Sequence, residues 1–286
     1  MCGIFGVVSS REVSQLILQG LRKLEYRGYD SAGLATIQNS KNSQFGELVT
    51  RKSKGKLKNL SNLIQKQPIE GHLGIGHTRW ATHGKPNEIN AHPHVDYTGQ
   101  IAVVQNGIIE NYRDLSKGLQ LKGIEFTSET DTEIIPHLIG LEIENSLDKG
   151  IAANGETLLR AVQKVLLLLE GTYSIAVIWS KAPDALVVAR RQSPLVLGFG
   201  EGEFFCASDT PALFGFTRTF LPLKDHEIAL LTPLGIELYD ENGNRQHRAP
   251  SPLKGTELFA DKRNFRHFML KEIYEQPETA QLWIDR

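Results

Sequence analysis

Hydrophobic residues along the chain follow two different periods. Apolar positions three and four residues apart predict helices over residues 12–24, 57–64, 111–122, 132–147 and 156–169. Short apolar runs predict strands in the first half at residues 3–8, 34–37, 73–80 and 101–104. Further runs, separated by Gly, Pro and Asp, predict strands at residues 173–179, 185–189, 203–207, 227–231 and 236–239.

The strands of the second half follow one another after short turns. Parallel neighbours need a connection of about a dozen residues or more, so we expect mostly antiparallel pairs and an α+β fold. Polar residues with Pro and Gly over 245–255 are typical of a linker, and the pattern becomes helical again at 267–280. We therefore predict that the core domain ends at residue 240.

Composition and charge narrow the possible partners. The chain has 286 residues, 40% of them hydrophobic, and a net charge of −1 from 32 basic and 33 acidic side chains. This balance provides no overall field for nucleic acid or an anionic membrane, so we expect small metabolites as partners. Two cysteines, Cys2 and Cys206, argue against a disulfide framework and for the reducing cytoplasm. No signal peptide is recognisable, and the apolar run 165–169 is too short to span a bilayer.

The first residues offer a nucleophile. A small residue after Met1 allows Met1 to be removed, and Cys2 would then carry both a thiol and a free α-amine that can act as its base. The alternative is a small buried hydrophobe that opens an edge strand. Gly3 and Gly6 favour the first interpretation, because glycine in a strand often marks the close approach of a ligand or another backbone.

Four histidines, His77, His83, His92 and His94, suggest a metal site as an alternative. We discount it, because no Asp, Glu or Cys stands at a spacing that completes a ligand set, and Arg79 repels a cation. We predict no metal and expect two or three of these histidines to be hydrogen-bonding loop residues. The basic stretch 51–58 resembles a phosphate-binding patch, but we interpret its charges as the solvated face of the following helix.

A nucleophilic attack on an amide explains several other residues. The developing oxyanion needs donors, which the Asn106 side chain and the Gly107 N–H can supply. Arg79 offers a planar fork for a carboxylate, and Asp131 offers a carboxylate for an ammonium group. Asn106 and Gly107 are also compatible with a hairpin turn, but the residues that follow do not mirror the preceding strand.

Five motifs together resemble a known family. These are CGIFG at 2–6, LEYRGYDSAG at 24–33, HTRWATHG at 77–84, NGIIEN at 106–111 and SETDTE at 128–133. They are similar to the glutaminase domain of the glutamine–fructose-6-phosphate aminotransferases, and the similarity extends along the whole chain. The second and third motifs look like this hexosamine branch and unlike the phosphoribosyl branch of the class II amidotransferases.

The resemblance implies an N-terminal-nucleophile hydrolase fold, a four-layer α-β-β-α sandwich of antiparallel sheets, without a cofactor. It also implies a role for each matching residue. Cys2 would attack L-glutamine; Arg79, Thr82 and Asp131 would hold its α-groups, with His83 nearby; Asn106 and Gly107 would stabilise the oxyanion; Arg27 would support the nucleophile; and Trp80 would lie on a closing loop. Gln105 departs from the family, in which many members have His, and this puts one supporting contact in doubt.

The resemblance also predicts the domain organisation. Residues 1–240 would form the glutaminase domain, 241–264 an interdomain linker, and 265–286 the start of a sugar isomerase domain that these residues do not otherwise include. Fructose 6-phosphate would bind only through that domain, and the complete enzyme could be a homodimer. Two other classes stay open at this point, a metal-dependent hydrolase and a non-catalytic module that binds glutamine or a partner.

Overall fold

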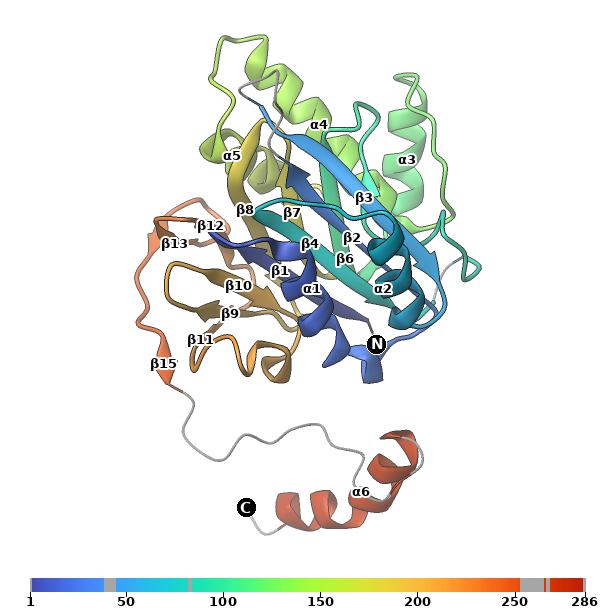
Figure 1. The fold of residues 1–286 in the computed structure, drawn as a ribbon. Coiled ribbons are helices and arrows are strands. Elements are labelled where there is room, and N and C mark those ends of the chain that lie inside the picture. The colour runs from blue at the N-terminus through green and yellow to red at the C-terminus, as the bar shows by residue number, and fades with distance from the viewer. Residues whose placement is uncertain (1, 39–44, 82–83, 253–264, 266–267, 285–286) are drawn as a thin grey trace. The chain divides into compact units, whose positions relative to one another are not determined.

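The structure is a computed structural model that describes residues 2–38, 45–81, 84–252, 265 and 268–284 (Figure 1). The chain divides into two compact units, Met1–Lys254 and Gly255–Arg286. Within the second unit, α6 spans Phe268–Ile284. No helix in the described residues is both long and apolar enough to cross a membrane.

Two antiparallel sheets form the centre of the first unit. In spatial order the first sheet contains β15 Ser251–Pro252, β11 Thr219–Pro222, β9 Val196–Phe199, β10 Phe204–Ala207, β1 Gly3–Val8, β4 Leu73–Arg79, β2 Ser31–Gln38 and β3 Glu47–Lys54. The second sheet contains β14 Arg245–Gln246, β13 Gly235–Tyr239, β12 Ile228–Thr232, β8 Ala182–Arg191, β7 Gly171–Trp179, β6 Ile101–Ile109 and β5 His94–Val95.

Helices cover the outer faces of the two sheets. They are α1 Val13–Arg22 and α2 Leu57–Lys66 on the first sheet, and α3 Tyr112–Gln120, α4 Ile134–Leu147 and α5 Gly155–Leu166 on the second. Short 3-10 helices are η1 Glu25–Arg27, η2 Asp131–Glu133 and η3 Thr210–Leu213. The Asn154 side chain caps α5 by accepting the Thr157 N–H over 2.9 Å, as an N-cap residue should.

Alternating side chains explain why the unit has four layers. In β1, Phe5 and Val7 pack under α1, whereas Ile4 and Val8 point to the second sheet. The same alternation in β6 and β7 fills the space between the sheets and the space under α4 and α5. Because both faces of the central strands are buried, their sequences read as continuous apolar runs. The order is helices, sheet, sheet, helices, as the family resemblance implies.

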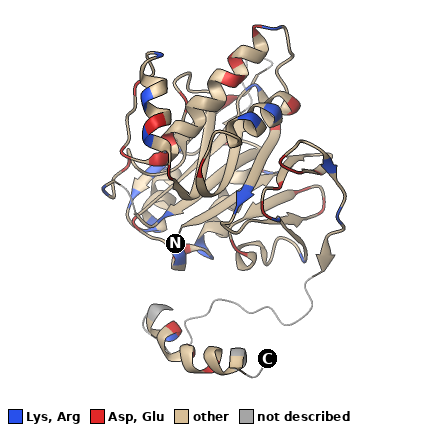
Figure 2. Cartoon of the chain, turned by 180° about the vertical axis from the view of Figure 1, so that it is seen from behind, with Lys and Arg blue, Asp and Glu red and all other residues tan. Residues whose placement is uncertain are grey.

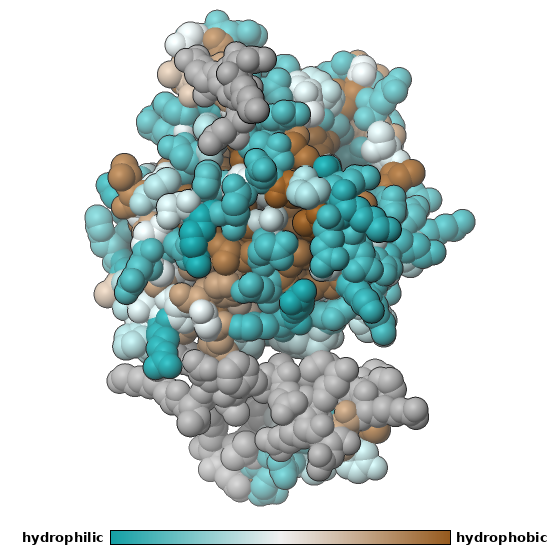
Figure 3. Space-filling view, in the orientation of Figure 1, coloured by the Kyte–Doolittle hydropathy of each residue, from teal (hydrophilic) through white to brown (hydrophobic). Residues whose placement is uncertain are grey.

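The surface is polar and mixed in charge. In Figure 3, hydrophobic residues show between hydrophilic ones in the middle of one face of the first unit. Figure 2 shows Lys and Arg interspersed with Asp and Glu over the helices and loops, while the central strands carry few charges. The scarcity of charges on the central strands follows from their apolar residues, which fill three buried clusters.

The structure corrects the interpretation of the basic stretch 51–58. Residues Arg51 to Lys54 belong to β3, and α2 begins only at Leu57. β3 pairs with β2 along its whole length, from Ser31↔Lys54 to Gln38↔Glu47. The hydrogen bonds to a buried neighbour thus make this polar segment a strand, which its own hydrophobic pattern does not indicate.

The first unit extends past the predicted boundary at residue 240. Arg245–Gln246 pairs with β13, and Ser251–Pro252 pairs with β11, so both segments close an edge of a sheet. The compact unit therefore runs to Lys254. The linker at 241–264 and the isomerase start at 265–286 stay predictions, and residues 253–264 lie outside the described residues.

Candidate active site

Cys2 lies directly before β1, in the middle of the first sheet. β1 pairs with β4 in the register Gly3↔Thr78, and this brings the thiol to the backbone that follows β4. There the Trp80 N–H donates to Cys2 Sγ over 3.3 Å. Burial raises the pKa of the Cys2 thiol, although this N–H and the charges of Arg79 and Arg27 oppose the rise. The thiol is therefore mostly protonated at neutral pH and needs a base to become a nucleophile.

Two side chains hold the carbonyl group of Cys2. It accepts hydrogen bonds from Arg27 Nε at 3.2 Å and from Asn106 Nδ2 at 3.1 Å. Asp209, which follows β10, fixes Arg27 in turn, because its Oδ2 lies 2.9 Å from Arg27 Nη1 and also accepts the Tyr26 hydroxyl. Arg27 and Asn106 thus anchor the backbone of Cys2 directly, and Asp209 supports it through Arg27.

The loop after η1 can approach the end of β4 because residue 28 is glycine. A Cβ at Gly28 would lie 2.7 Å from the Arg79 carbonyl carbon and 2.8 Å from Trp80 N. Asp30, on the same loop, accepts the Ala81 N–H over 2.9 Å and donates its own N–H to Arg79 O over 3.0 Å. The loop and the residues after β4 therefore form one wall beside the thiol.

Asn106 and Gly107 lie within β6 and do not form a hairpin turn. They pair with Ser174 and Tyr173 of β7, so the turn alternative is wrong. Gly107 has φ of 119°, and a Cβ there would lie 2.0 Å from Thr172 O. This backbone conformation requires glycine.

Arg79 and Asp131 bring opposite charges to the site. Their exposed fractions are 4% and 7%. Burial lowers the pKa of Arg79, whereas the charges of Cys2, Asp30 and Asp131 favour its charged form. Asp131 Oδ2 accepts the Ile109 N–H over 2.7 Å, which ties η2 to β6. A buried guanidinium and a carboxylate held by a backbone N–H have the charges that complement the two α-groups of an amino acid.

The remaining predicted residues are distributed as follows. The Trp80 ring is 43% exposed and meets the Tyr29 ring edge-on, with centroids 5.5 Å apart. Thr82 and His83 lie outside the described residues. Direct hydrogen bonds connect Cys2 with Arg27, Trp80 and Asn106.

Three of the four histidines are buried and make contacts with protein groups. His77 stacks on His92, with centroids 4.2 Å and planes 14° apart, and His94 Nε2 lies 2.9 Å from Thr130 Oγ1. Burial lowers the pKa of His77 to about 3 and the pKa values of the other two well below 6.5. They are hydrogen-bonding residues as predicted, but His77 and His94 lie in strands and not in loops. No group of three or more potential ligands in the described residues could hold a metal ion.

Gln105, the departure from the family pattern, has a partner of its own. Its Oε1 accepts the Thr132 hydroxyl over 2.7 Å, and its N–H donates to His92 Nδ1 over 3.2 Å. The side chain is 3% exposed. Gln105 therefore supports the segment before Asn106 from inside the protein.

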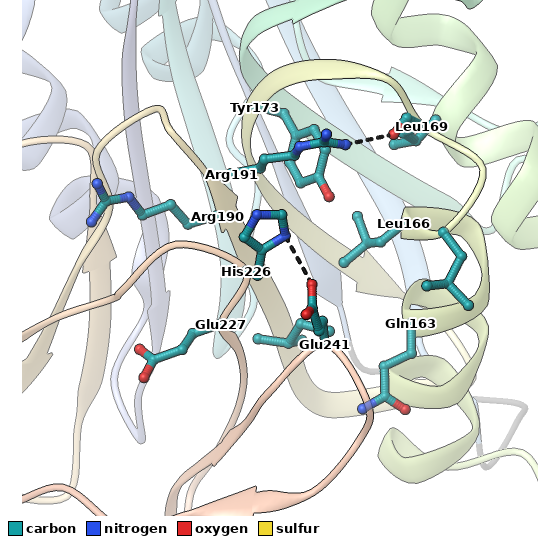
Figure 4. A pocket seen from close by; sticks show the side chains of 11 residues that line it. Gln163, Leu166, Leu169, Tyr173, Arg190, Arg191, His226, Glu227 and Glu241 are labelled. Atoms are coloured by element: carbon teal, nitrogen blue, oxygen red, sulfur yellow. Dashed lines mark hydrogen bonds and ion pairs between the residues drawn. The ribbon is translucent and has the colours of Figure 1, made fainter.

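A separate cavity of about 250 Å³ lies between the end of α5 and the turn before β12 (Figure 4). His226 Nδ1 lies 3.2 Å from Glu241 Oε2, and Arg191 donates to Leu169 O over 3.0 Å. The cavity's lining residues include no candidate nucleophile. Because these charged groups already have partners within the protein, we assign the chemistry to the surroundings of Cys2.

The sequence alone did not single out Asp209 or the contact between His77 and Asn106. Asp209 comes with Ser208 directly after the buried β10, and the Ser208 hydroxyl accepts the Ile4 N–H over 3.0 Å. Polar residues directly after a buried strand can mark a functional site, and the sequence shows this feature at Ser208 and Asp209. Which distant residue they would meet depends on the order β10-β1-β4 in the sheet.

Comparison with protein families places the site in context. Residues 77–215 match the model of a glutamine amidotransferase domain, a range that includes Arg79, Asn106, Asp131 and Asp209. The chain is 54% identical to the glutamine–fructose-6-phosphate aminotransferase [isomerizing] of Thermosynechococcus vestitus over 285 residues, which is 100% of this chain and 44% of that protein. It is 45% identical to the enzyme of the same name from Clostridium acetobutylicum, over 98% of this chain and 43% of that protein. The chain thus spans less than half the length of these relatives.

Solved structures show the same fold. The glutamine phosphoribosylpyrophosphate amidotransferase from B. subtilis has a TM-score of 0.69 at 24% identity and covers 85% of this chain and 50% of its own. A structure described as the allosteric regulatory enzyme of purine biosynthesis matches with a TM-score of 0.69 at 25% identity, over the same shares of both chains. The prediction of an N-terminal-nucleophile α-β-β-α sandwich is confirmed.

Proposed function

The chain belongs to the glutamine amidotransferases, and from that premise we propose that it hydrolyses the side-chain amide of L-glutamine with Cys2 as the nucleophile. The observation that carries this proposal is the position of the thiol. It accepts the Trp80 N–H, while Arg27 and Asn106 hold the Cys2 carbonyl. The products are glutamate and ammonia.

The α-amine of Cys2 acts as the base once Met1 is removed. An α-amino group has a pKa of about 7.7–8.0, so part of it is unprotonated at neutral pH. It takes the thiol proton as sulfur attacks the amide carbon, and the carbonyl electron pair moves to oxygen. Collapse of this intermediate expels ammonia, which receives the proton from the amine, and leaves a thioester on Cys2. Water then cleaves the thioester and releases glutamate.

Asn106 and Gly107 stabilise the oxyanion. The Asn106 amide carries two protons on Nδ2, and one of them points to the Cys2 carbonyl at 3.1 Å. The second proton remains for the substrate oxygen, together with the Gly107 N–H. Donors fixed before the reaction act most strongly on charge that develops in the transition state.

Arg79 and Asp131 select the amino-acid end of the substrate. The guanidinium binds the α-carboxylate of glutamine and the Asp131 carboxylate binds its α-ammonium group. Thr82 and His83 complete this binding site, and the exposed Trp80 ring covers it when glutamine is bound. Arg27 keeps Cys2 in place through the carbonyl contact.

The name of the relatives supports a proposal for the wider reaction. We propose that the chain is the glutaminase part of a glutamine–fructose-6-phosphate aminotransferase, which transfers the ammonia to fructose 6-phosphate and makes glucosamine 6-phosphate. The sugar phosphate binds in a sugar isomerase domain beyond the linker 241–264, and residues 265–286 are the start of that domain. The complete enzyme acts in the cytoplasm as a homodimer, and its glutaminase step uses no cofactor and involves no nucleic acid or membrane.

A glutaminase assay on protein with a sequenced N-terminus tests the proposal. Cys2→Ala, and a form that retains a residue before Cys2, should both lose glutamate release, because one lacks the thiol and the other lacks the free amine. Cys206→Ala is the matched control. That thiol is buried between the sheets, so its removal should leave the rate of glutamate release unchanged. Normal glutamate release from Cys2→Ala would refute the mechanism, and loss of activity with a chelator would favour a metal-dependent hydrolase.

A further inference from the structure

The stacked histidines next to β6 have no role in the function proposed so far. His77 Nε2 lies 3.0 Å from Asn106 Oδ1 and 3.1 Å from the carbonyl oxygen of Gln105. We propose that His77 is a positioning residue for the oxyanion hole, whose N–H fixes the Asn106 amide with its NH₂ group towards Cys2. This inference rests on the proposed glutaminase function and extends it to a residue that does not touch the substrate.

The chemistry of the neighbours determines how both side chains are oriented. The Cys2 carbonyl can only accept a hydrogen bond, so the amide atom 3.1 Å away must be the nitrogen of Asn106. The Gln105 carbonyl can also only accept, so His77 Nε2 must carry a proton. The same N–H therefore points to Asn106 Oδ1 as well, and the two groups fit in one orientation only.

Burial keeps His77 in this protonation state. The side chain has an exposed fraction of 0%, and burial is the main reason that its pKa falls to about 3. A neutral imidazole has a single N–H, which the two acceptors place on Nε2. Nδ1 has no hydrogen-bond partner in the described part of the chain, which is tolerable for an acceptor and costly for an unpaired donor.

The second histidine of the stack holds the same segment. His92 packs against the His77 ring at 4.2 Å, and its Nδ1 accepts the Gln105 N–H over 3.2 Å. The stack therefore binds both the N–H and the carbonyl of the residue before Asn106. An aliphatic side chain at position 77 could fill the space, but it could not orient the amide.

A double-mutant cycle separates positioning from general stability. His77→Leu removes the N–H, and His77→Gln restores a donor at a similar distance from the backbone. In the full chain we expect His77→Leu to lower kcat about 10- to 100-fold, less than the roughly 10²–10³-fold loss from removing an oxyanion donor outright, with KM within about 2-fold. His77→Gln should recover most of the lost kcat. In an Asn106→Ala background, His77→Leu should cause no further loss, because its effect passes through that amide.

The results decide between the two roles. A loss of the same size in the Asn106→Ala background, or an equal loss in folded His77→Gln and His77→Leu, would overturn the proposal and indicate a packing role. If His77→Leu does not fold, ¹⁵N NMR of the wild-type imidazole decides, since Nε2–H supports the proposal whereas Nδ1–H or a charged ring overturns it. Inactive wild-type protein with a free Cys2 would refute the glutaminase function itself, whereas active wild type with unaffected His77→Leu refutes only this inference.

Discussion

At Cys2, neighbouring side chains do different work, and kinetics can tell them apart. In the proposed mechanism Asn106 meets the substrate oxygen as charge develops on it, so it should act mainly in the transition state. In the same mechanism Arg79 binds a carboxylate that is present both before and after attack, so it should act on glutamine binding. Both residues are buried, and only the step at which each is needed differs.

Replacing Asn106 and replacing Arg79 should therefore change different kinetic constants. We expect Asn106→Ala to lower kcat by about 10²–10³ with a smaller effect on KM. Arg79→Lys should mainly raise KM for glutamine, because an ammonium group cannot form the two-pronged contact with a carboxylate. Steady-state kinetics of glutamate release measure both constants. Equal and mild increases of KM in both variants, with kcat unchanged, would remove these assignments.

The sequence singled out the residues that we propose to face the substrate, but it did not single out Asp209, which supports Arg27. Arg79, Asn106 and Asp131 carry chemistry that an amide hydrolase needs, and their types and motifs show it. Asp209 meets Arg27 across 182 positions of the chain, and only the placement of β10 beside β1 brings them together. Local patterns hold no information about such a pair.

Among the elements, the loop after η1 depends on the absence of a side chain at Gly28. Gly28→Ala should push the loop away from Arg79 and Trp80, because the new Cβ would lie 2.7 Å and 2.8 Å from their backbone atoms. We expect at least a 10-fold loss of kcat/KM and a lower melting temperature, measured by the glutaminase assay and by calorimetry.

Gly118→Ala provides the control for that change. Gly118 lies in α3, and a Cβ there would have no neighbour within 4 Å. Alanine favours a helix over glycine by about 1 kcal/mol, so this variant should be as stable as the wild type or slightly more stable, with the same activity. If Gly28→Ala behaved like Gly118→Ala, the close approach of the loop would not matter.

The start of α4 depends on the charge of a buried carboxylate. Glu133 is 3% exposed and accepts the backbone N–H groups of Thr127 over 2.8 Å and of Ser128 over 2.6 Å. Burial alone would raise its pKa, but His137 Nε2, 3.8 Å from Glu133 Oε1, and the hydrogen bonds from Ser128 and Thr127 outweigh burial and hold the pKa well below 4.5. The charged form is therefore the one that the fold stabilises.

Glu133→Gln should lower the free energy of unfolding by about 1–3 kcal/mol at pH 7, since an amide offers donors to groups that already donate. In the wild type, the charged Glu133 contributes fully to the free energy of unfolding above the unfolded-state pKa of about 4.3. This contribution is lost as the pH falls through the lower folded-state pKa. Urea titrations between pH 3 and pH 7 should show the two proteins converging in acid. A difference that is constant with pH would exclude the charge as its cause.

The pattern of hydrophobic residues predicted most of the buried elements, but it missed the short buried strand β9 and the half-buried strand β3. Helices α1, α2 and α5 have apolar faces that pack on a sheet, so their spacing is regular. β3 has mostly half-buried residues and is a strand because β2 offers it eight paired positions. A pairing partner that lies elsewhere in the chain is invisible to a local pattern.

For the whole molecule, the first unit should be sufficient for the glutaminase step. Every contact described around Cys2 involves residues up to Asp209, well inside the unit that ends at Lys254. A polypeptide of residues 1–254 should therefore melt at the temperature of the full chain and release glutamate at its rate. Loss of activity on truncation would show that residues beyond 254 contribute to the site.

With fructose 6-phosphate present, the same polypeptide should yield glutamate and ammonia but no glucosamine 6-phosphate. The sugar phosphate should also leave the rate of glutamate release unchanged. An effector acts only by binding two states of a protein differently, and in our proposal the sugar site lies in the isomerase domain, outside residues 1–254. Chromatography of the products and a coupled assay for glutamate measure both effects. Formation of glucosamine 6-phosphate, or a clear increase in rate, would place a sugar site within residues 1–254.

The outermost strands of the two sheets also govern how copies of the molecule behave towards one another. Within the described residues, three of the four sheet edges are formed by strands of two residues each, β5, β14 and β15, which are too short to template another strand. The fourth edge, β3, has eight residues, and it carries Arg51, Lys52 and Lys54. A second copy whose own β3 docked there in parallel and in register would bring like charges side by side. We therefore expect the basic residues of this strand to oppose edge-to-edge polymerisation, and replacing all three with Thr should make the protein aggregate.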